Sequence, residues 1–145
     1  MKLTRHFINF NFIILIFFIS LPASAQTVIT CSSLKGKAYY FPNVANTKGS
    51  WEDDGFSNGK RILYKNGENF DIFYSSPPDG KSVLKYGGQV FPLMITDDMQ
   101  QFLAVDPMGY TEIYLFDLKN KIMSLSQHST ASVATKTATY IASCN

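Results

Sequence analysis

Apolar and polar residues alternate in short runs along residues 26–145. In the run 70–75, for example, Phe70, Ile72 and Tyr74 fall on one face of an extended chain, and Asp71 falls on the other. A period of two is typical of a β-strand with one buried face, whereas an amphipathic helix repeats about every 3.6 residues. We find no convincing helical period over about ten or more residues, so the pattern predicts an all-β protein.

The same pattern predicts a series of short strands separated by turn sequences. The expected strands cover residues 27–31, 36–41, 61–65, 70–75, 82–86, 89–95, 101–105, 110–116, 121–127 and 136–143. Asn66-Gly67 and Gly87-Gly88 predict two-residue hairpin loops, because glycine adopts the positive φ that such turns require. Pro78-Asp79-Gly80 and Asp106-Pro107-Met108-Gly109 predict β-turns, since proline favours the second turn position and glycine the last.

Many short strands with turns at intervals of about 8–12 residues are typical of antiparallel sandwiches and barrels. We therefore predict one domain, residues 26–145, in which an antiparallel meander forms a small barrel or sandwich. Pro92 lacks the N–H that a central strand donates, so its strand should lie at a sheet edge or carry a bulge.

The first 25 residues have the pattern of a secretory signal peptide. Lys2 and Arg5 precede an apolar run at 12–21, and Ala23-Ser24-Ala25 places small residues before the expected cleavage site at Gln26. The apolar run is shorter than the roughly 20 residues that span a bilayer, so we expect no membrane insertion after cleavage. The mature protein is expected to be periplasmic or secreted.

Two cysteines lie in the expected mature chain, at Cys31 and Cys144. Disulfides persist in exported proteins, and two cysteines allow one pairing. We therefore predict a disulfide that joins the first and last strands and closes most of the mature chain into one loop. Free thiols and a catalytic thiol remain as alternatives, although the chain has no Cys-x-x-Cys spacing.

Charge and composition argue against several classes of partner. The 13 Lys and Arg include Lys2 and Arg5 of the leader, so the mature chain retains 11, which equals its 11 Asp and Glu. A neutral chain lacks the basic excess that binds nucleic acid, so no nucleic-acid partner is expected. There is no glycine-rich phosphate loop, and His128 is the one histidine of the mature chain. We predict neither a cofactor nor a metal site.

The segment 42–59 is expected to be a long loop, and loops of about 18 residues usually carry a function or structure of their own. It contains Trp51 followed by Glu52, Asp53 and Asp54, a candidate binding loop for a cation, a basic partner or a sugar ring. The acids lack the regular offsets of a calcium loop. The alternative is that Trp51 packs into the core while the acids stay in solvent.

A second connection, 128–135, is rich in Ser, Thr and Ala and predicts a flexible hairpin loop. A general base needs a partner nucleophile within hydrogen-bond reach, and sequence proximity to Ser126, Ser129 and Asp117 does not establish one for His128. We therefore predict that the protein is not an enzyme.

A series of residues and short runs spans nearly the whole mature chain: Cys31, Gly36, Tyr39-Tyr40, Trp51, Asp54, Gly59, 71–74, 111–116 and 140–144. In this spacing the chain resembles a group of small exported proteobacterial proteins of unknown function, which implies export without implying an activity. It is also similar, more weakly, to the periplasmic lysozyme inhibitors in size, strand content and disulfide. Their inhibitory loop carries a Ser-Ala-Ser-Gly-type motif, and the nearest stretch here, 129–133, has no glycine.

Three functions follow as hypotheses. The first is an exported non-enzymatic β-domain that binds a small molecule, an envelope component or a protein partner. The second is a periplasmic inhibitor of a host or phage hydrolase such as lysozyme, in which the 128–135 loop enters the partner's cleft. The third is a hydrolase, which requires the fold to bring together Asp54, Asp71, Glu112 and His128.

Overall fold

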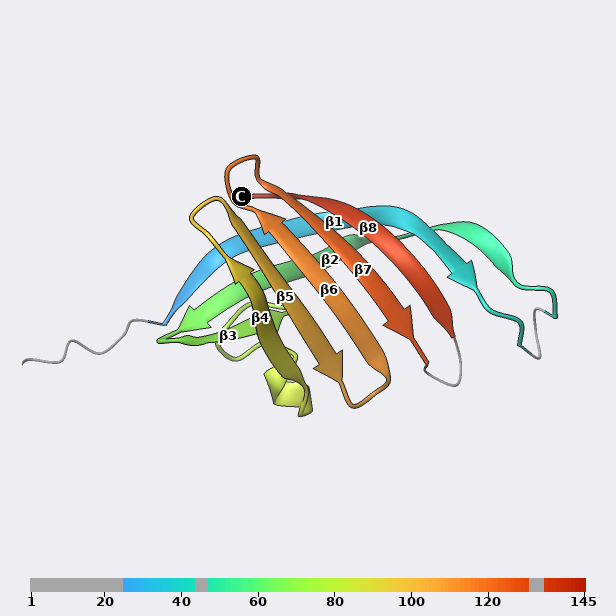
Figure 1. Cartoon of the computed structure of the whole chain (residues 1–145), viewed down its shortest axis with the longest axis horizontal. Helices are drawn as coiled ribbons and strands as arrows, with labels where there is room; N and C mark the ends of the chain where they lie inside the picture. The colour runs from blue at the N-terminus through green and yellow to red at the C-terminus, as the bar shows by residue number, and fades with distance from the viewer. Residues whose placement is uncertain (1–24, 44–46, 131–134) are drawn as a thin grey trace, which may run out of the picture.

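A computed structural model describes residues 25–43, 47–130 and 135–145 (Figure 1). These residues form eight strands and one short 3₁₀ helix, which confirms the all-β class. The elements are β1 (Gln26–Tyr40), β2 (Ser50–Asn66), β3 (Asn69–Phe73), the helix η1 (Leu84–Tyr86), β4 (Gln89–Ile95), β5 (Met99–Asp106), β6 (Tyr110–Asp117), β7 (Ile122–Ser129) and β8 (Lys136–Cys144).

The strands form one antiparallel sheet in the order β3-β2-β1-β8-β7-β6-β5-β4. The strands β1 to β3 pair in chain order, as do β4 to β8, and the pairing of β1 with β8 joins these two meanders and leaves β3 and β4 as the edge strands. In Figure 1 the strands β1, β2 and β3 cross behind β4 to β8. Strand twist curls such a sheet onto itself, and the result is a nearly closed barrel rather than a sandwich.

The segment between β3 and β4 covers the opening that the sheet order leaves between these two strands. Ser82 forms an isolated antiparallel bridge with Phe73. The N–H of Val83 donates to the Ile72 carbonyl at 3.0 Å, and the N–H of Gly88 donates to the Val83 carbonyl at 2.9 Å. Val83 is fully buried, so this segment adds an apolar side chain to the core as well as backbone hydrogen bonds.

The core lies inside the barrel, because alternate residues of each strand point to the same face. Its largest fully buried apolar side chains are Ile29, Leu34, Leu63, Ile72, Val83, Phe102, Phe116, Met123 and Leu125. Burying one such side chain is worth about 1.5–3 kcal/mol. The period-two pattern of the sequence therefore supplies the main driving force for closing the barrel.

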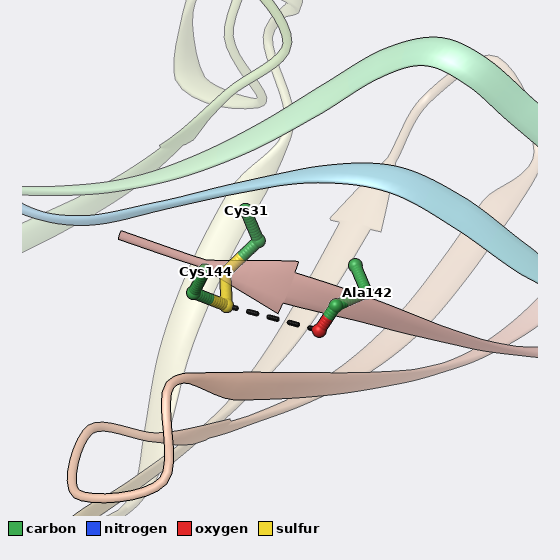
Figure 2. Close-up of a disulfide and its surroundings, with 3 residues drawn as sticks. All are labelled: Cys31, Ala142 and Cys144. Carbon is green, nitrogen blue, oxygen red and sulfur yellow. Dashed lines mark hydrogen bonds between the residues drawn. A yellow bond between two sulfur atoms is a disulfide. The ribbon is translucent and has the colours of Figure 1, made fainter.

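The predicted disulfide between Cys31 and Cys144 is confirmed. The two residues are direct partners across β1 and β8, with Cα atoms 3.9 Å apart and an S–S distance of 2.02 Å. Figure 2 shows the bond between the two strands and a dashed line of 4.0 Å from Cys144 Sγ to the Ala142 carbonyl. A bridged sulfur carries no proton, so we interpret this line as a van der Waals contact.

Gly36 is required where β1 approaches β8 beyond the disulfide. Its backbone partner is Tyr140, and a Cβ atom at this position would lie 1.9 Å from the Thr139 carbonyl oxygen. Any other residue would force the two strands apart at the centre of their pairing.

Near the start of the described chain, two expected strands form one strand, and part of an expected loop is a strand. The expected strands 27–31 and 36–41 belong to the single strand β1, whose pairing is irregular between Ser32 and Leu34. The strand β2 begins at Ser50, so the expected loop at 42–59 is wrong for its second half. Cross-strand pairing with β1 continues to the Tyr40–Ser50 pair and overrides the polar composition of this segment.

The expected strand 82–86 is wrong, since this stretch ends in the helix η1. Asp71 Oδ1 accepts a hydrogen bond from the Leu84 N–H at 3.2 Å, and Ser82 Oγ accepts one from the Lys85 N–H at 3.2 Å. Gly87, with φ of 81°, ends the helix rather than forming a hairpin loop. By contrast, the expectation for Pro92 is confirmed, because β4 is the last strand of the sheet and carries an irregularity after Pro92.

The expected leader falls almost entirely outside the described residues, at 1–24. Within the part of the chain that the structure describes, no helix is long and apolar enough to cross a membrane.

Removing the disulfide should destabilise the barrel strongly. In the chain-entropy model, closing a loop of about 100 residues stabilises the folded state by about 4–5 kcal/mol. We expect Cys31→Ser/Cys144→Ser to lose a free energy of unfolding of this order in urea titrations. Wild-type protein treated with a reductant is the matched control and should lose the same amount; an unchanged midpoint in both samples would contradict the prediction.

Candidate functional site

The inward-facing residues of β6 change from apolar to polar along the strand. Starting near the disulfide, these positions are Phe116, Tyr114, Glu112 and Tyr110. The neighbouring strands β5, β7 and β8 also place buried polar side chains at the end away from the disulfide. The barrel therefore has an apolar closed end and a polar open end.

A cavity of about 460 Å³, which we call the mouth cavity, lies at the polar end of the barrel. Its aromatic and apolar lining residues are Tyr40, Phe56, Tyr74, Tyr86, Met108 and Tyr110. Its polar lining residues are Arg61, Asp106, Glu112, Gln127, Ser129 and Lys136. The size falls within the range of about 300–1,000 Å³ that is typical of small-molecule sites.

Lys136, at the start of β8, binds Asp54 on β2. Its Nζ atom lies 2.6 Å from Asp54 Oδ2 and 2.9 Å from the hydroxyl oxygen of Tyr140. The same carboxylate oxygen accepts hydrogen bonds from the hydroxyls of Tyr140 at 2.7 Å and Tyr40 at 3.1 Å. This network joins β1, β2 and β8 at the end of the barrel opposite the disulfide.

The environment keeps both members of this pair charged at neutral pH. Burial disfavours the charge of Lys136, but hydrogen bonds with Asp54 and Tyr140 outweigh burial and raise the pKa of Lys136. Burial alone would raise the pKa of Asp54, yet the hydrogen bonds from Lys136 and Tyr140 lower it. The ammonium also lies 5.4 Å from the ring centre of Tyr40 and 5.6 Å from that of Phe56, within cation–π range.

Arg61 on β2 reaches across the interior to β6. Its Nε atom donates to the Tyr114 hydroxyl at 3.0 Å, and its Nη2 atom lies 3.7 Å from Glu112 Oε1. The Tyr114 hydroxyl donates to Glu112 Oε2, and Gln127 Nε2 donates to Glu112 Oε1 at 2.6 Å. The guanidinium lies 4.6 Å from the ring centre of Tyr74. Arg61 and Glu112 are thus a second charged pair, which side chains of β6 and β7 and the ring of Tyr74 hold in place.

The tyrosine hydroxyls around Arg61 remain protonated and can act as donors. Burial and the nearby Glu112 carboxylate raise the pKa of Tyr114 and that of Tyr74, and the opposing effect of Arg61 is smaller. Burial disfavours the charge of Arg61, but the interactions with Tyr114 and Glu112 raise its pKa.

Two further polar groups of the mouth cavity retain acceptor capacity. Gln127 Oε1 is buried and has no hydrogen-bond partner among the described residues. Asp106 uses Oδ1 to accept the Met108 N–H at 2.6 Å, and no cation of the described chain forms an ion pair with it.

The residues of the predicted binding loop lie on the strand β2 and not in a loop: Trp51, Glu52, Asp53 and Asp54. Trp51 is 68% exposed and contacts Tyr39 at 5.5 Å between ring centres, so the core-plug interpretation is wrong. Asp53 forms an exposed ion pair with Lys37 at 3.1 Å. Strand alternation separates these residues, and of the acids Asp54 is the one that binds Lys136 at the mouth cavity.

The four residues required by the hydrolase hypothesis do not converge. Asp54 and Glu112 each bind a cation at the mouth cavity. Asp71 instead accepts the N–H groups of Ile72 and Leu84, and His128 lies exposed on β7. Among the residues that the structure describes, no group of three His, Cys, Asp or Glu side chains could hold a metal ion.

Sequence reasoning named Asp54 for the binding loop and, with Glu112, for the hydrolase hypothesis, and it missed Arg61 and Lys136 as residues of this site. The alternation pattern contained a signal for two of these residues. Glu112 falls on the same face of its strand as Tyr114, and Lys136 falls on the same face as Ala138 and Tyr140. A charged residue on the inward face of an alternating strand indicates a buried partner. Which partner it meets depends on strand order.

No family model, no curated protein and no solved structure matches this chain. The resemblance to an exported proteobacterial group and to lysozyme inhibitors therefore stays a prediction.

Breaking the Lys136–Asp54 pair should cost stability. Lys136→Met leaves the half-buried Asp54 carboxylate without its cation, and because Asp54 is partly solvated we expect a loss of about 1–3 kcal/mol, below that of a fully buried pair. We expect the double variant Lys136→Met/Asp54→Asn to regain part of this loss, as measured by urea unfolding of all three variants. Lys37→Met, which breaks the exposed pair with Asp53, is the control and should leave the unfolding midpoint unchanged.

Alkaline pH should lower the free energy of unfolding by ionising Tyr140 at the polar end of the barrel. Burial raises the pKa of Tyr140 to about 12, although Lys136 opposes the shift. When the pKa of a tyrosine is higher in the folded than in the unfolded protein, its contribution to stability is complete below the unfolded pKa of about 10. This contribution is lost as the pH rises through the folded pKa. We expect the free energy of unfolding to fall between these two pH values, and Tyr140→Phe to flatten the fall. A slope identical to that of the wild type would contradict this role of Tyr140.

Trp51 should emit as an exposed indole. Since the side chain is 68% exposed on β2, we expect red-shifted fluorescence that acrylamide quenches readily. The unfolded protein in urea is the reference, and its quenching constant should be close to the folded value. Blue-shifted, poorly quenched emission would instead indicate a buried tryptophan.

Proposed function

We propose that this chain is an exported, non-enzymatic barrel that binds a small organic molecule in the mouth cavity. The observation that carries the proposal is a cavity of about 460 Å³ lined by five aromatic side chains and several fixed polar groups. Apolar walls with a few convergent polar groups are the usual composition of ligand pockets. The proposed ligands include an envelope component that carries a group small enough to enter this cavity.

The electrostatics of the cavity support binding rather than catalysis. A lysine or tyrosine that acts as a general base or nucleophile needs a pKa lowered toward neutrality, so that it can accept a proton or attack. Here the pKa values of Lys136, Tyr74 and Tyr114 are raised, which keeps all three protonated. Their protons are held in hydrogen bonds to Glu112, Asp54 and Tyr140, so these groups shape a fixed, charge-balanced wall for a ligand.

Export to the periplasm or the extracellular space is supported by two features. The leader at 1–25 has the signal-peptide pattern, and the Cys31–Cys144 bond is of a kind that persists in oxidising compartments. The rival role as a periplasmic inhibitor of a hydrolase depends on the stretch 129–133, of which residues 131–133 lie outside the described part of the chain.

Binding can be tested by screening small organic compounds against ¹⁵N-labelled mature protein by NMR. Compounds that bind should shift the amide signals of Tyr86, Tyr110 and Gln127 and leave the Trp51 indole signal in place. Tyr86→Ala removes one wall of the cavity and should raise the Kd of such a compound about tenfold, which corresponds to about 1.4 kcal/mol.

Tyr39→Ala is the matched control for Tyr86→Ala, because Tyr39 lies outside the cavity beside Trp51. It should leave the Kd unchanged. Shifts confined to the Trp51 region, or an equal loss in both variants, would place binding on the outer surface and contradict the proposal.

A further inference from the structure

We propose that the mouth cavity selects an organic cation, in particular an ammonium group carried on an apolar or aromatic body. This inference rests on the proposed function, since it assigns a ligand class to the same cavity. Two nearly buried acceptors with unused capacity, the charge balance of the cavity and the exposed ring of Tyr86 carry the argument.

The first acceptor is Asp106, the last residue of β5. It is 8% exposed and lines the mouth cavity. Its Oδ1 atom holds the following turn by accepting the Met108 N–H at 2.6 Å. Within the described residues no Lys or Arg neutralises this carboxylate, whereas Asp54 and Glu112 each have a cation. A nearly buried charge is costly unless it is paired, and a bound cation would pair it.

The second acceptor is Gln127, which is 4% exposed on β7. Its Nε2 atom donates to Glu112 Oε1 at 2.6 Å, and this bond sets the orientation of the amide. The Oε1 atom then has no donor among the described residues. A buried acceptor without a partner is unfavourable, and a ligand N–H that reaches Oε1 would relieve this cost.

The cations of the cavity are already engaged. Lys136 binds Asp54 and Tyr140, and Arg61 binds Glu112 and Tyr114. An anionic ligand would have to compete with these carboxylates at short range. Three carboxylates therefore face two cations around the cavity, which leaves one negative charge for a ligand to neutralise.

The aromatic walls suit a cation as well. One face of Tyr74 is covered by Arg61 at 4.6 Å, while Tyr86 stacks beside Tyr74 at 6.4 Å between ring centres and is 40% exposed. An ammonium near the exposed face of Tyr86 would be attracted by the ring quadrupole. A metal ion fits less well, because the described residues contain no cluster of three metal-binding side chains.

The experiment compares three probes of similar shape at neutral pH: phenethylamine, phenethyl alcohol and hydrocinnamate. Each is titrated into the full mature protein, and Kd is taken from the amide shifts of residues at the mouth cavity. We expect phenethylamine to bind at least about tenfold more tightly than the alcohol, and hydrocinnamate to bind most weakly.

Two variants then test the acceptors. Asp106→Asn keeps an oxygen for the Met108 N–H but removes the charge, so the Kd of phenethylamine should rise about tenfold while that of the alcohol stays unchanged. Gln127→Met should weaken the amine as well. Asp53→Asn, which removes an exposed carboxylate on β2, is the matched control and should change neither Kd. Urea unfolding confirms that each variant is folded.

The outcomes separate this inference from the proposed function. Equal affinity for the three probes, or an equal loss of amine and alcohol binding in Asp106→Asn, overturns cation selectivity and leaves ligand binding standing. If none of the probes shifts the signals of the mouth cavity at millimolar concentration, the inference fails. If the broader compound screen also finds no binder there, the proposed function fails with it.

Discussion

The pairing of β1 with β8 is the constraint on which the rest of the structure depends. It joins the two meanders of the sheet, and it is held at three levels: the Cys31–Cys144 bond near the closed end, the close approach at Gly36, and the Lys136 network near the mouth. Without this pairing the sheet would divide into two separate meanders, β1 to β3 and β4 to β8, each with its apolar face open to solvent. Because β1 and β8 meet, every strand between them turns the same face inward, and a core and a cavity can form.

The interior is divided along the barrel axis. Near the disulfide, buried side chains such as Phe116 and Met123 exclude water, while at the other end Arg61 and Glu112 face each other across the barrel. Burying charged pairs stabilises the fold little or not at all compared with apolar packing, because desolvation offsets their attraction. Stability is therefore supplied mainly by the apolar end and the covalent bond, and the polar end contributes little to it.

Much of the fold could be predicted from the sequence. Alternation in runs such as 110–116 predicted strands, and β6 (Tyr110–Asp117) confirms that one. The cysteine pairing also followed, since two cysteines allow one bond. The errors arose where local signals were weak or ambiguous: the segment around Trp51 is polar but pairs with β1, and the stretch 82–86 has strand-like residues but is held in a turn by Asp71. In both places a distant partner decided the conformation.

The sequence by itself determined the all-β class, the inward face of strands with clear alternation such as β6, and the identity of the bond that closes the barrel, because period-two alternation and cysteine number are local or countable properties. Only the tertiary structure decided that Lys136 meets Asp54 from 82 positions away, that Arg61 meets Glu112, and that Asp106 and Gln127 share a cavity. Strand order and barrel closure set those meetings. They depend on the packing of all eight strands at once, which no single stretch of sequence encodes.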